Sequence, residues 1–397
     1  MDISSTIHII LLLLAPVCAL FWIIGIMSRK TRQKAHNLIS MVLVVFTVAY
    51  FLFISYFTPL ASAVTDILYM AFALAIPVMH LLFYKQVTDP EGIRPSDYWL
   101  TIPNSILLLA TITLYSILGK ESSELFIQSV VLANDINVPA QHITTSWKLL
   151  AFTTYYGFRV ILLMEILYVQ IWAFFKVSVY NRHLDEYFSD SEQRGKKTNI
   201  IIYFSGLCAI GAATGLLALP FQKLVENSFL FVAMSLITSV AVFCTGFASY
   251  RIEFTAEKLA ELLKKNDSEV SEKESEIAPK SDDLDISERT YEQIVRGLMK
   301  LAAEKEFLKP ELSLIDVSEA IGTNRTYLTK VIHSYFNCSF SDYINLLRIE
   351  YAEKILQDTP SMTMQEVAIN SGFTTLSSFY RNFQKFTGTT PAKWMSA

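Results

Sequence analysis

The sequence is poor in cysteine, and its cysteines are not arranged for a disulfide framework or a metal site. Of the four, Cys18, Cys208 and Cys244 lie in apolar stretches, Cys338 stands alone, and no CxxC or cysteine–histidine cluster occurs. The sequence therefore indicates neither a disulfide-stapled domain nor a zinc site. Glycine-rich phosphate loops and nucleophile–base motifs are equally lacking, so it predicts no enzyme, no cofactor and no metal.

Charge is the second deficit, and it is unevenly distributed. Only 18% of the 397 residues are charged, whereas 52% are apolar and 13% aromatic. Residues 1–252 carry 30 charged side chains, and the shorter segment 253–397 carries 40. A single soluble globule is excluded by this composition, and two chemically different parts are indicated.

Long uncharged stretches fill the first part. A stretch of 18 or more residues can cross about 30 Å of hydrocarbon. Six stretches reach that length: residues 3–28, 35–65, 67–84, 98–119, 198–222 and 227–250. A seventh, residues 149–177, is interrupted by Arg159 and Glu165 but is otherwise as apolar. The sequence predicts an all-α fold with a seven-helix transmembrane sensor domain over residues 1–252, and the first span is too long for a cleavable signal.

The basic residues of the short loops predict the orientation. Eleven lie in the loops after spans one, three and five: Arg29, Lys30, Arg32, Lys34, Lys85, Arg94, Lys176, Arg182, Arg194, Lys196 and Lys197. The alternate loops hold three, Lys120, Lys148 and Lys223. Because cytoplasmic loops carry an excess of Lys and Arg, the N-terminus is expected outside and the C-terminus in the cytoplasm. This predicts a multi-pass protein of a bacterial inner (plasma) membrane, in contact with membrane lipid.

Three polar residues within the spans are candidates for membrane sensing. Ionisable groups inside a bilayer are costly and usually face the bundle interior. Glu165 is the first candidate, either as a ligand or proton site or as a structural partner of a neighbouring helix. Arg159 is expected near the outer interface, where it snorkels. His80, close to Pro77 in the third span, is the third candidate.

The segment 253–288 is predicted to be a signalling helix followed by an acidic flexible linker. Ile252, Ala256, Leu259 and Leu263 are spaced like a short coiled-coil seam. Two interpretations stay open: a helix that transmits motion or dimer contact, or an ordinary amphipathic cap. Residues 253–288 then hold 12 acidic and 5 basic side chains, a composition that favours an extended tether.

Residues 289–397 contain two helix-turn-helix patterns. In the first, a helix over 314–321 is followed by Gly322, an N-cap at Asn324 and a helix to about Tyr335. In the second, a helix over 364–370 is followed by Gly372 and a helix from about Thr375 to Phe386. The apolar spacing of 340–356 predicts one long helix packed against both units.

The segment Leu312–Trp394 resembles the DNA-binding region of AraC/XylS transcription regulators, in which a long helix joins two helix-turn-helix units. The residues that match the family pattern are Val367, Ala368, Gly372, Phe373, Phe379, Arg381, Phe383, Lys385, Gly388, Pro391 and Trp394. Two mild departures are Ser318, where the family usually has alanine, and Met395, where a basic residue is common. The resemblance implies sequence-specific binding of double-stranded promoter DNA by residues 289–397.

The residue chemistry agrees with this implication, since Arg, Lys, Ser and Thr on a helix in the major groove can read bases. Candidate base readers are Arg325, Thr326, Thr329 and Lys330 in the first unit and Ser377, Ser378 and Arg381 in the second. Thr374, Thr375, Lys385 and Lys393 are better placed for phosphate contacts. Two such helices one DNA turn apart would read successive major-groove windows.

Together these features favour a membrane-embedded one-component regulator that senses an external or membrane signal. We expect a homodimer, an unidentified signal ligand and RNA polymerase as a further partner. A second hypothesis is a receptor or transporter-like protein whose C-terminal helices bind a protein, because the charge of 289–397 is nearly neutral, with 12 basic and 11 acidic residues. A third is that proteolysis in the acidic linker releases a soluble regulator.

Overall fold

The computed structural model describes residues 3–57, 60–132, 144–188, 229–252, 255–261, 287–310 and 312–395. The described residues are helical and form no β-strand. The chain divides into two compact units, one made of Met1–Val177 and Lys197–Glu257, the other of Ser178–Lys196 and Lys258–Ala397. The all-α class is therefore confirmed for the described part of the chain.

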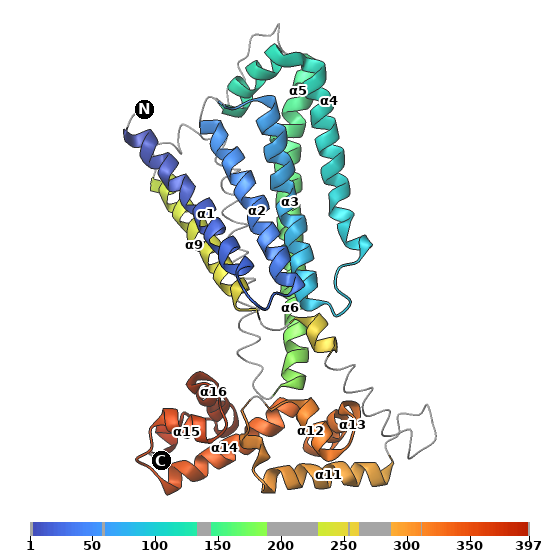
Figure 1. Cartoon of the computed structure of the whole chain (residues 1–397), viewed down its shortest axis with the longest axis vertical. Helices are drawn as coiled ribbons and strands as arrows, with labels where there is room; N and C mark the ends of the chain where they lie inside the picture. Colours follow the sequence, from blue (N-terminus) through green and yellow to red (C-terminus); the bar gives the residue numbers. More distant parts are fainter. Residues whose placement is uncertain are drawn as a thin grey trace. The chain divides into compact units, whose positions relative to one another are not determined.

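The first unit is a bundle of long apolar helices (Figure 1). They are α1 (Ile3–Met27), α2 (Lys34–Ile54), α3 (Ala63–Thr88), α4 (Thr101–Phe126), α5 (Thr145–Ala151), α6 (Phe158–Tyr187) and α9 (Phe229–Tyr250). The chain order is not the packing order, because α1 lies between α2 and α9, and α2 packs on α3. The buried faces of α1, α2, α3, α6 and α9 share an aliphatic and aromatic core that includes Ile26, Ile39 and Leu81.

Four segments of this unit are long and apolar enough to cross a membrane. They are Lys34–Ile54, Ala63–Thr88, Pro95–Ser129 and Thr145–Arg182. The apolar parts of α1 and α9, Leu13–Met27 and Ser235–Tyr250, are shorter. The predicted stretch 198–222 lies outside the described residues, so seven transmembrane helices stay a prediction.

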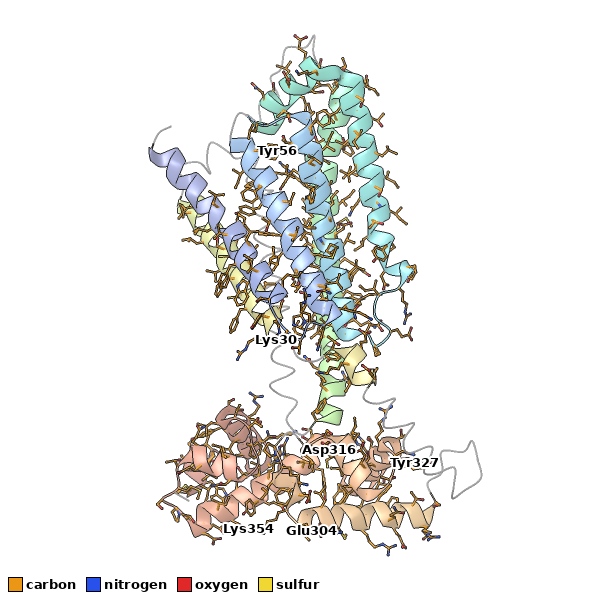
Figure 2. All side chains as sticks on the ribbon, in the orientation of Figure 1. Lys30, Tyr56, Glu304, Asp316, Tyr327 and Lys354 are labelled. Carbon is orange, nitrogen blue, oxygen red and sulfur yellow. The ribbon has the colours of Figure 1, made fainter. Side chains whose placement is uncertain are left out.

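The break between the second and third predicted spans lies earlier than we expected. The uncharged stretches placed it at Asp66, but α2 ends at Ile54 and α3 already begins at Ala63, with Ser62 as its N-cap. Asp66 is buried in the first turn of α3. It accepts hydrogen bonds from the Tyr56 hydroxyl (2.5 Å to Oδ1) and the Tyr115 hydroxyl (2.8 Å to Oδ2); Figure 2 labels Tyr56. A carboxyl group therefore lies inside the bundle, where it joins three segments.

The segment after α9 is held by the first unit itself. Ile252 and Ala256 are buried, and Ile252 belongs to the core that α1, α2 and α3 share. Glu257 accepts from Lys34 Nζ at 2.5 Å and from Gln86 Nε2 at 2.9 Å. Ile252 and Ala256, two residues of the predicted coiled-coil spacing, are thus covered within the chain. Both interpretations of this segment stay open, and Leu263 lies outside the described residues.

The second unit contains the predicted helix-turn-helix segments. Its helices are α11 (Glu288–Ala303), α12 (Leu314–Ile321), α13 (Arg325–Val331), α14 (Phe340–Asp358), α15 (Met364–Asn370), α16 (Leu376–Thr387) and α17 (Pro391–Met395). The long helix α14 lies between α12–α13 and α15–α16 (Figure 1). Two apolar cores result, one around Leu298, Leu328 and Ile344, the other around Phe379 and Phe383. The predicted long helix joining two units is confirmed.

Candidate nucleic-acid interface

The first helix-turn-helix is closed by hydrogen bonds at each end of its turn. The Ser313 hydroxyl accepts from the Asp316 amide and begins α12. Gly322 ends α12 with φ 74°, a left-handed conformation that favours glycine. The Asn324 side chain then accepts from the Tyr327 amide at 2.8 Å and begins α13. The predicted turn and N-cap are therefore where the sequence placed them.

The second helix-turn-helix uses the same chemistry. Thr363 and Glu366 form a capping box at the start of α15, and the donors of Thr363 lower the pKa of Glu366. Gly372 has φ 83° in the turn. The Thr375 hydroxyl accepts from the Ser378 amide at 3.2 Å and begins α16. The phosphate contact predicted for Thr375 stays a prediction. The Thr375 hydroxyl already accepts the hydrogen bond that caps α16.

One face of α13 carries the predicted base readers of the first helix-turn-helix. Thr326 and Lys330 are exposed, and Arg325 and Thr329 are half-buried. The opposite face is formed by Leu328 and Val331, which are fully buried. Because positions i and i+4 lie on one side of a helix, the four polar residues share a surface.

The exposed face of α16 carries Ser377, Arg381 and Lys385. Phe379 and Phe383 are buried on the other side. Lys385 Nζ lies 2.5 Å from Asp342 Oδ1 on α14, so a phosphate contact from Lys385 would have to exchange this ion pair. Thr374 in the preceding turn is exposed.

Ser378 does not belong to this face. Its side chain is buried, and Asn382 Nδ2 donates to its carbonyl oxygen at 3.0 Å. The prediction that Ser378 is exposed for base reading is therefore wrong. The side chain three positions after the N-cap turns towards the core, next to Phe379.

Comparison with known proteins identifies the kind of domain that contains these helices. The family model described as a helix-turn-helix domain matches residues 317–397. Residues 317–397 form an AraC-type helix-turn-helix domain.

Curated relatives match a short part of the chain. An uncharacterized HTH-type transcriptional regulator of Staphylococcus aureus (strain MSSA476) is 33% identical over 84 residues, which are 21% of this chain and 11% of that protein. The melibiose operon regulatory protein of Escherichia coli (strain K12) is 28% identical over 83 residues, 21% of this chain and 27% of that protein.

A solved structure is also similar to part of the chain. It is the C-terminal domain of AraT, a response regulator from Geobacillus stearothermophilus, with 25% identity and a TM-score of 0.24. The match covers 26% of this chain and 84% of that one.

The AraC-type domain contains a buried arginine that the sequence interpretation missed. Arg348 lies on α14 and is fully buried. Its Nε donates to the Phe307 carbonyl and its Nη2 to the Lys309 carbonyl, each at 2.8 Å. A basic residue at i+4 from Ile344 and i−4 from Ala352, both buried, was the available signal.

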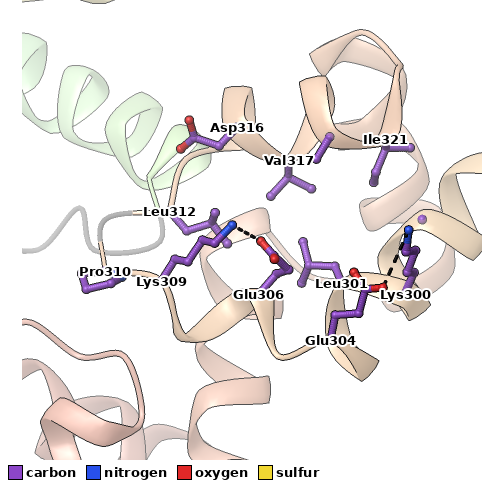
Figure 3. A pocket seen from close by; sticks show the side chains of 12 residues that line it. Lys300, Leu301, Glu304, Glu306, Lys309, Pro310, Leu312, Asp316, Val317 and Ile321 are labelled. Carbon is purple, nitrogen blue, oxygen red and sulfur yellow. Dashed lines mark ion pairs between the residues drawn. The ribbon is translucent and has the colours of Figure 1, made fainter.

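A pocket of about 450 Å³ lies between α11 and α12 and includes the short η7 helix (Glu306–Leu308; Figure 3). Its apolar lining includes Leu301, Val317 and Ile321. Lys300 pairs with Glu304 at 3.7 Å, and Lys309 pairs with Glu306. With Asp316 also in the lining, the acids outnumber the lysines, so this pocket does not favour a phosphate-bearing ligand.

The three candidate sensing residues lie apart in the first unit. Glu165 is buried on α6, and the Asn104 amide nitrogen on α4 lies 3.4 Å from its Oε2. Arg159 is half-buried and close enough to Asp66 to interact electrostatically, so it faces a partner rather than only snorkelling. His80 Nδ1 hydrogen-bonds with the Ile76 carbonyl in its own helix at 3.0 Å. Asp66, which the sequence interpretation treated only as a break between spans, interacts with Arg159, whereas His80 bonds within its own helix.

Proposed function

We propose that the chain is a membrane-embedded transcription regulator whose AraC-type domain binds promoter DNA in the cytoplasm. The observation that carries the proposal is the pair of helices α13 and α16, each with a buried apolar back and a polar outer face. A helix of this kind reads base edges from the major groove with a few side chains. Arg325 and Arg381 have the donors that read guanine best.

The outer surface of the first unit supports a membrane location. Large apolar side chains point outwards along several helices, for example Ile24 on α1 (72% exposed), Leu109 on α4 (67%) and Met164 on α6 (66%). Exposed apolar surface on this scale is unstable in water and suits lipid. The excess of basic residues in alternate loops favours a cytoplasmic C-terminus.

The DNA-binding part of the proposal is tested with the full chain in lipid nanodiscs. Binding to DNA fragments, beginning with the region upstream of its own gene, is measured across a salt series. We expect sequence-preferring binding that weakens as salt rises. Arg325→Ala and Arg381→Ala should each weaken it by about 10- to 100-fold, because a bidentate base contact contributes about 1–3 kcal/mol.

Arg296→Ala is the matched control, since this exposed arginine on α11 pairs with Glu292 and lies outside both recognition helices. It should bind as the wild type does. Full-length protein that binds no fragment selectively would favour the alternative, in which the C-terminal helices bind a protein partner.

We propose that Glu165 takes part in sensing. Among the described residues, its Oε1 and the neighbouring Asn104 Oδ1 are buried acceptors without a hydrogen-bond partner. Asn104 Nδ2 also donates to the Leu74 carbonyl at 3.3 Å, so α3, α4 and α6 meet at this point. Buried acceptors without donors are costly, so a proton or a ligand donor arriving here would favour one packing of the three helices.

Glu165→Gln supplies an amide donor at this point and removes the ionisable group. We expect the output of a promoter reporter to change several-fold at equal protein level, within the range of 5- to 150-fold that a coupling of about 1–3 kcal/mol allows. The sequence preference of DNA binding in vitro should be unaltered. Ser105→Ala, an exposed α4 position, is the control. A reporter that gives the wild-type output with Glu165→Gln would remove Glu165 from sensing.

A further inference from the structure

Arg348 is a fully buried cation in the AraC-type domain. Its guanidinium group donates to two backbone carbonyls, those of Phe307 and Lys309, and Nη1 lies 3.5 Å from Asn345 Oδ1. Burying a charge is expensive unless its hydrogen-bonding groups are satisfied. The chain therefore maintains a costly residue at the centre of α14, and the partners of that residue show what it connects.

The carbonyl partners belong to the first helix-turn-helix side. Phe307 is in the η7 helix, and Lys309 follows it in the segment that leads to α12. Phe307 also packs in the apolar core that contains Leu328 of α13. Arg348 thus joins the segment that supports the first helix-turn-helix to the middle of α14.

The same guanidinium group also contacts the second helix-turn-helix. Its carbon atom lies 5.7 Å from the centre of the Phe373 ring, which packs against Phe379 of α16. A Cβ atom on Gly372 would lie 3.1 Å from Arg348 Nε and 2.8 Å from the Leu308 carbonyl oxygen. The turn of the second helix-turn-helix therefore lies directly against segment 307–309 and Arg348.

A lysine could not make these contacts together. The planar guanidinium group donates in several fixed directions and stacks on an aromatic ring, whereas an ammonium group is a single point charge. At this place α14, segment 307–309 and the turn at Gly372 are joined by one side chain. Removing it leaves the Phe307 and Lys309 carbonyls without this donor and leaves a gap beside Phe373.

We infer that Arg348 is a positioning residue that holds the two helix-turn-helix units at one relative placement, so that the domain recognises two operator halves at a single spacing. The inference rests on the proposed DNA binding. Rigidly held recognition helices require half-sites one helical turn apart, about 10–10.5 base pairs, whereas loosely joined units tolerate other spacings.

The experiment uses the full chain in nanodiscs and the operator found in the binding experiment above. Operators with 2 or 5 base pairs inserted between the two contacted windows are compared with the unaltered operator and with each half alone. For the wild type we expect an insertion to weaken binding by at least about tenfold, because one recognition helix loses its window. Arg348→Lys should bind the unaltered operator several-fold more weakly and lose less than about threefold on insertion.

Two further variants separate positioning from folding. Phe373→Leu removes the ring beside the guanidinium group and should also relax the spacing requirement. Ile349→Val shortens the neighbouring buried side chain of α14, and it should retain the strict requirement of the wild type. If a variant binds each operator half alone, both of its helix-turn-helix motifs are folded.

The outcomes are distinguishable from failure of the proposed function. A wild type that binds no operator contradicts DNA binding itself. A wild type that requires one spacing, together with an equally strict Arg348→Lys or Phe373→Leu that still binds single halves, overturns the inference alone. Loss of single-half binding in both variants also overturns it, because Arg348 would then maintain the fold rather than the spacing.

Discussion

Alanine in place of Gly372 is expected to destabilise the second helix-turn-helix by about 2–5 kcal/mol. The φ of 83° lies in the left-handed region, which costs an alanine about 1–2 kcal/mol. The new Cβ atom would lie 2.8 Å from the Leu308 carbonyl oxygen and 2.9 Å from Leu308 Cα. Both neighbours are backbone, so the chain must move, and overpacking of this kind adds about 1–3 kcal/mol.

Hydrogen exchange measured by mass spectrometry on the full chain checks this expectation. Protection of the α16 amides, residues 376–387, should fall by more than tenfold in Gly372→Ala, since 1.4 kcal/mol corresponds to a factor of ten. Gly388→Ala is the matched control: its φ is 74°, but no atom lies within 4 Å of the added Cβ. Equal losses in the two variants would show that backbone conformation alone matters and that Leu308 yields without cost.

The helix-turn-helix units could be predicted because their signals are local. Gly322 and Asn324 each act within one turn of chain, so their sequence positions determine their roles. The end of the first recognition helix was less accurate. The α-helix ends at Val331 and a π-helical turn, Ile332–Phe336, continues to the predicted end.

The polar site residues were harder to predict, because burial depends on contacts between distant segments. Ser378 lies in the first turn of α16, where the local sequence allows either a buried or an exposed side chain. It is buried beside Phe379, which packs in the core. Within the apolar pattern of 340–356, Leu346 is 38% exposed, while Arg348 is buried. Its partners lie about 40 residues earlier in the chain, and no local pattern indicates them.

The burial of Asp66 in the apolar bundle also depends on contacts between distant segments. In an uncharged stretch a carboxylate marks the end of a span, and this rule placed a boundary where α3 has already begun. The hydroxyls that stabilise Asp66 come from Tyr56, 10 positions before it, and from Tyr115, 49 positions after it. Only the folded bundle brings them together.

Asp66→Ala is expected to destabilise the first unit by about 3–5 kcal/mol. The substitution leaves the hydroxyls of Tyr56 and Tyr115 buried without their acceptor, and Arg159 loses a nearby opposite charge. The temperature at which half of the detergent-solubilised full chain remains monodisperse should fall by several degrees.

Tyr115→Phe distinguishes a hydrogen-bonded cluster from simple loss of packing. Alone, it removes one donor and should cost about 1.5–3 kcal/mol, the usual value for a hydrogen bond to a charged group. Combined with Asp66→Ala it should add little or even recover stability, because the unpaired hydroxyl is then gone. Such non-additivity measures the interaction directly. If the two effects simply add, Asp66 and Tyr115 act independently, and α3 and α4 are joined by apolar packing rather than by this carboxylate.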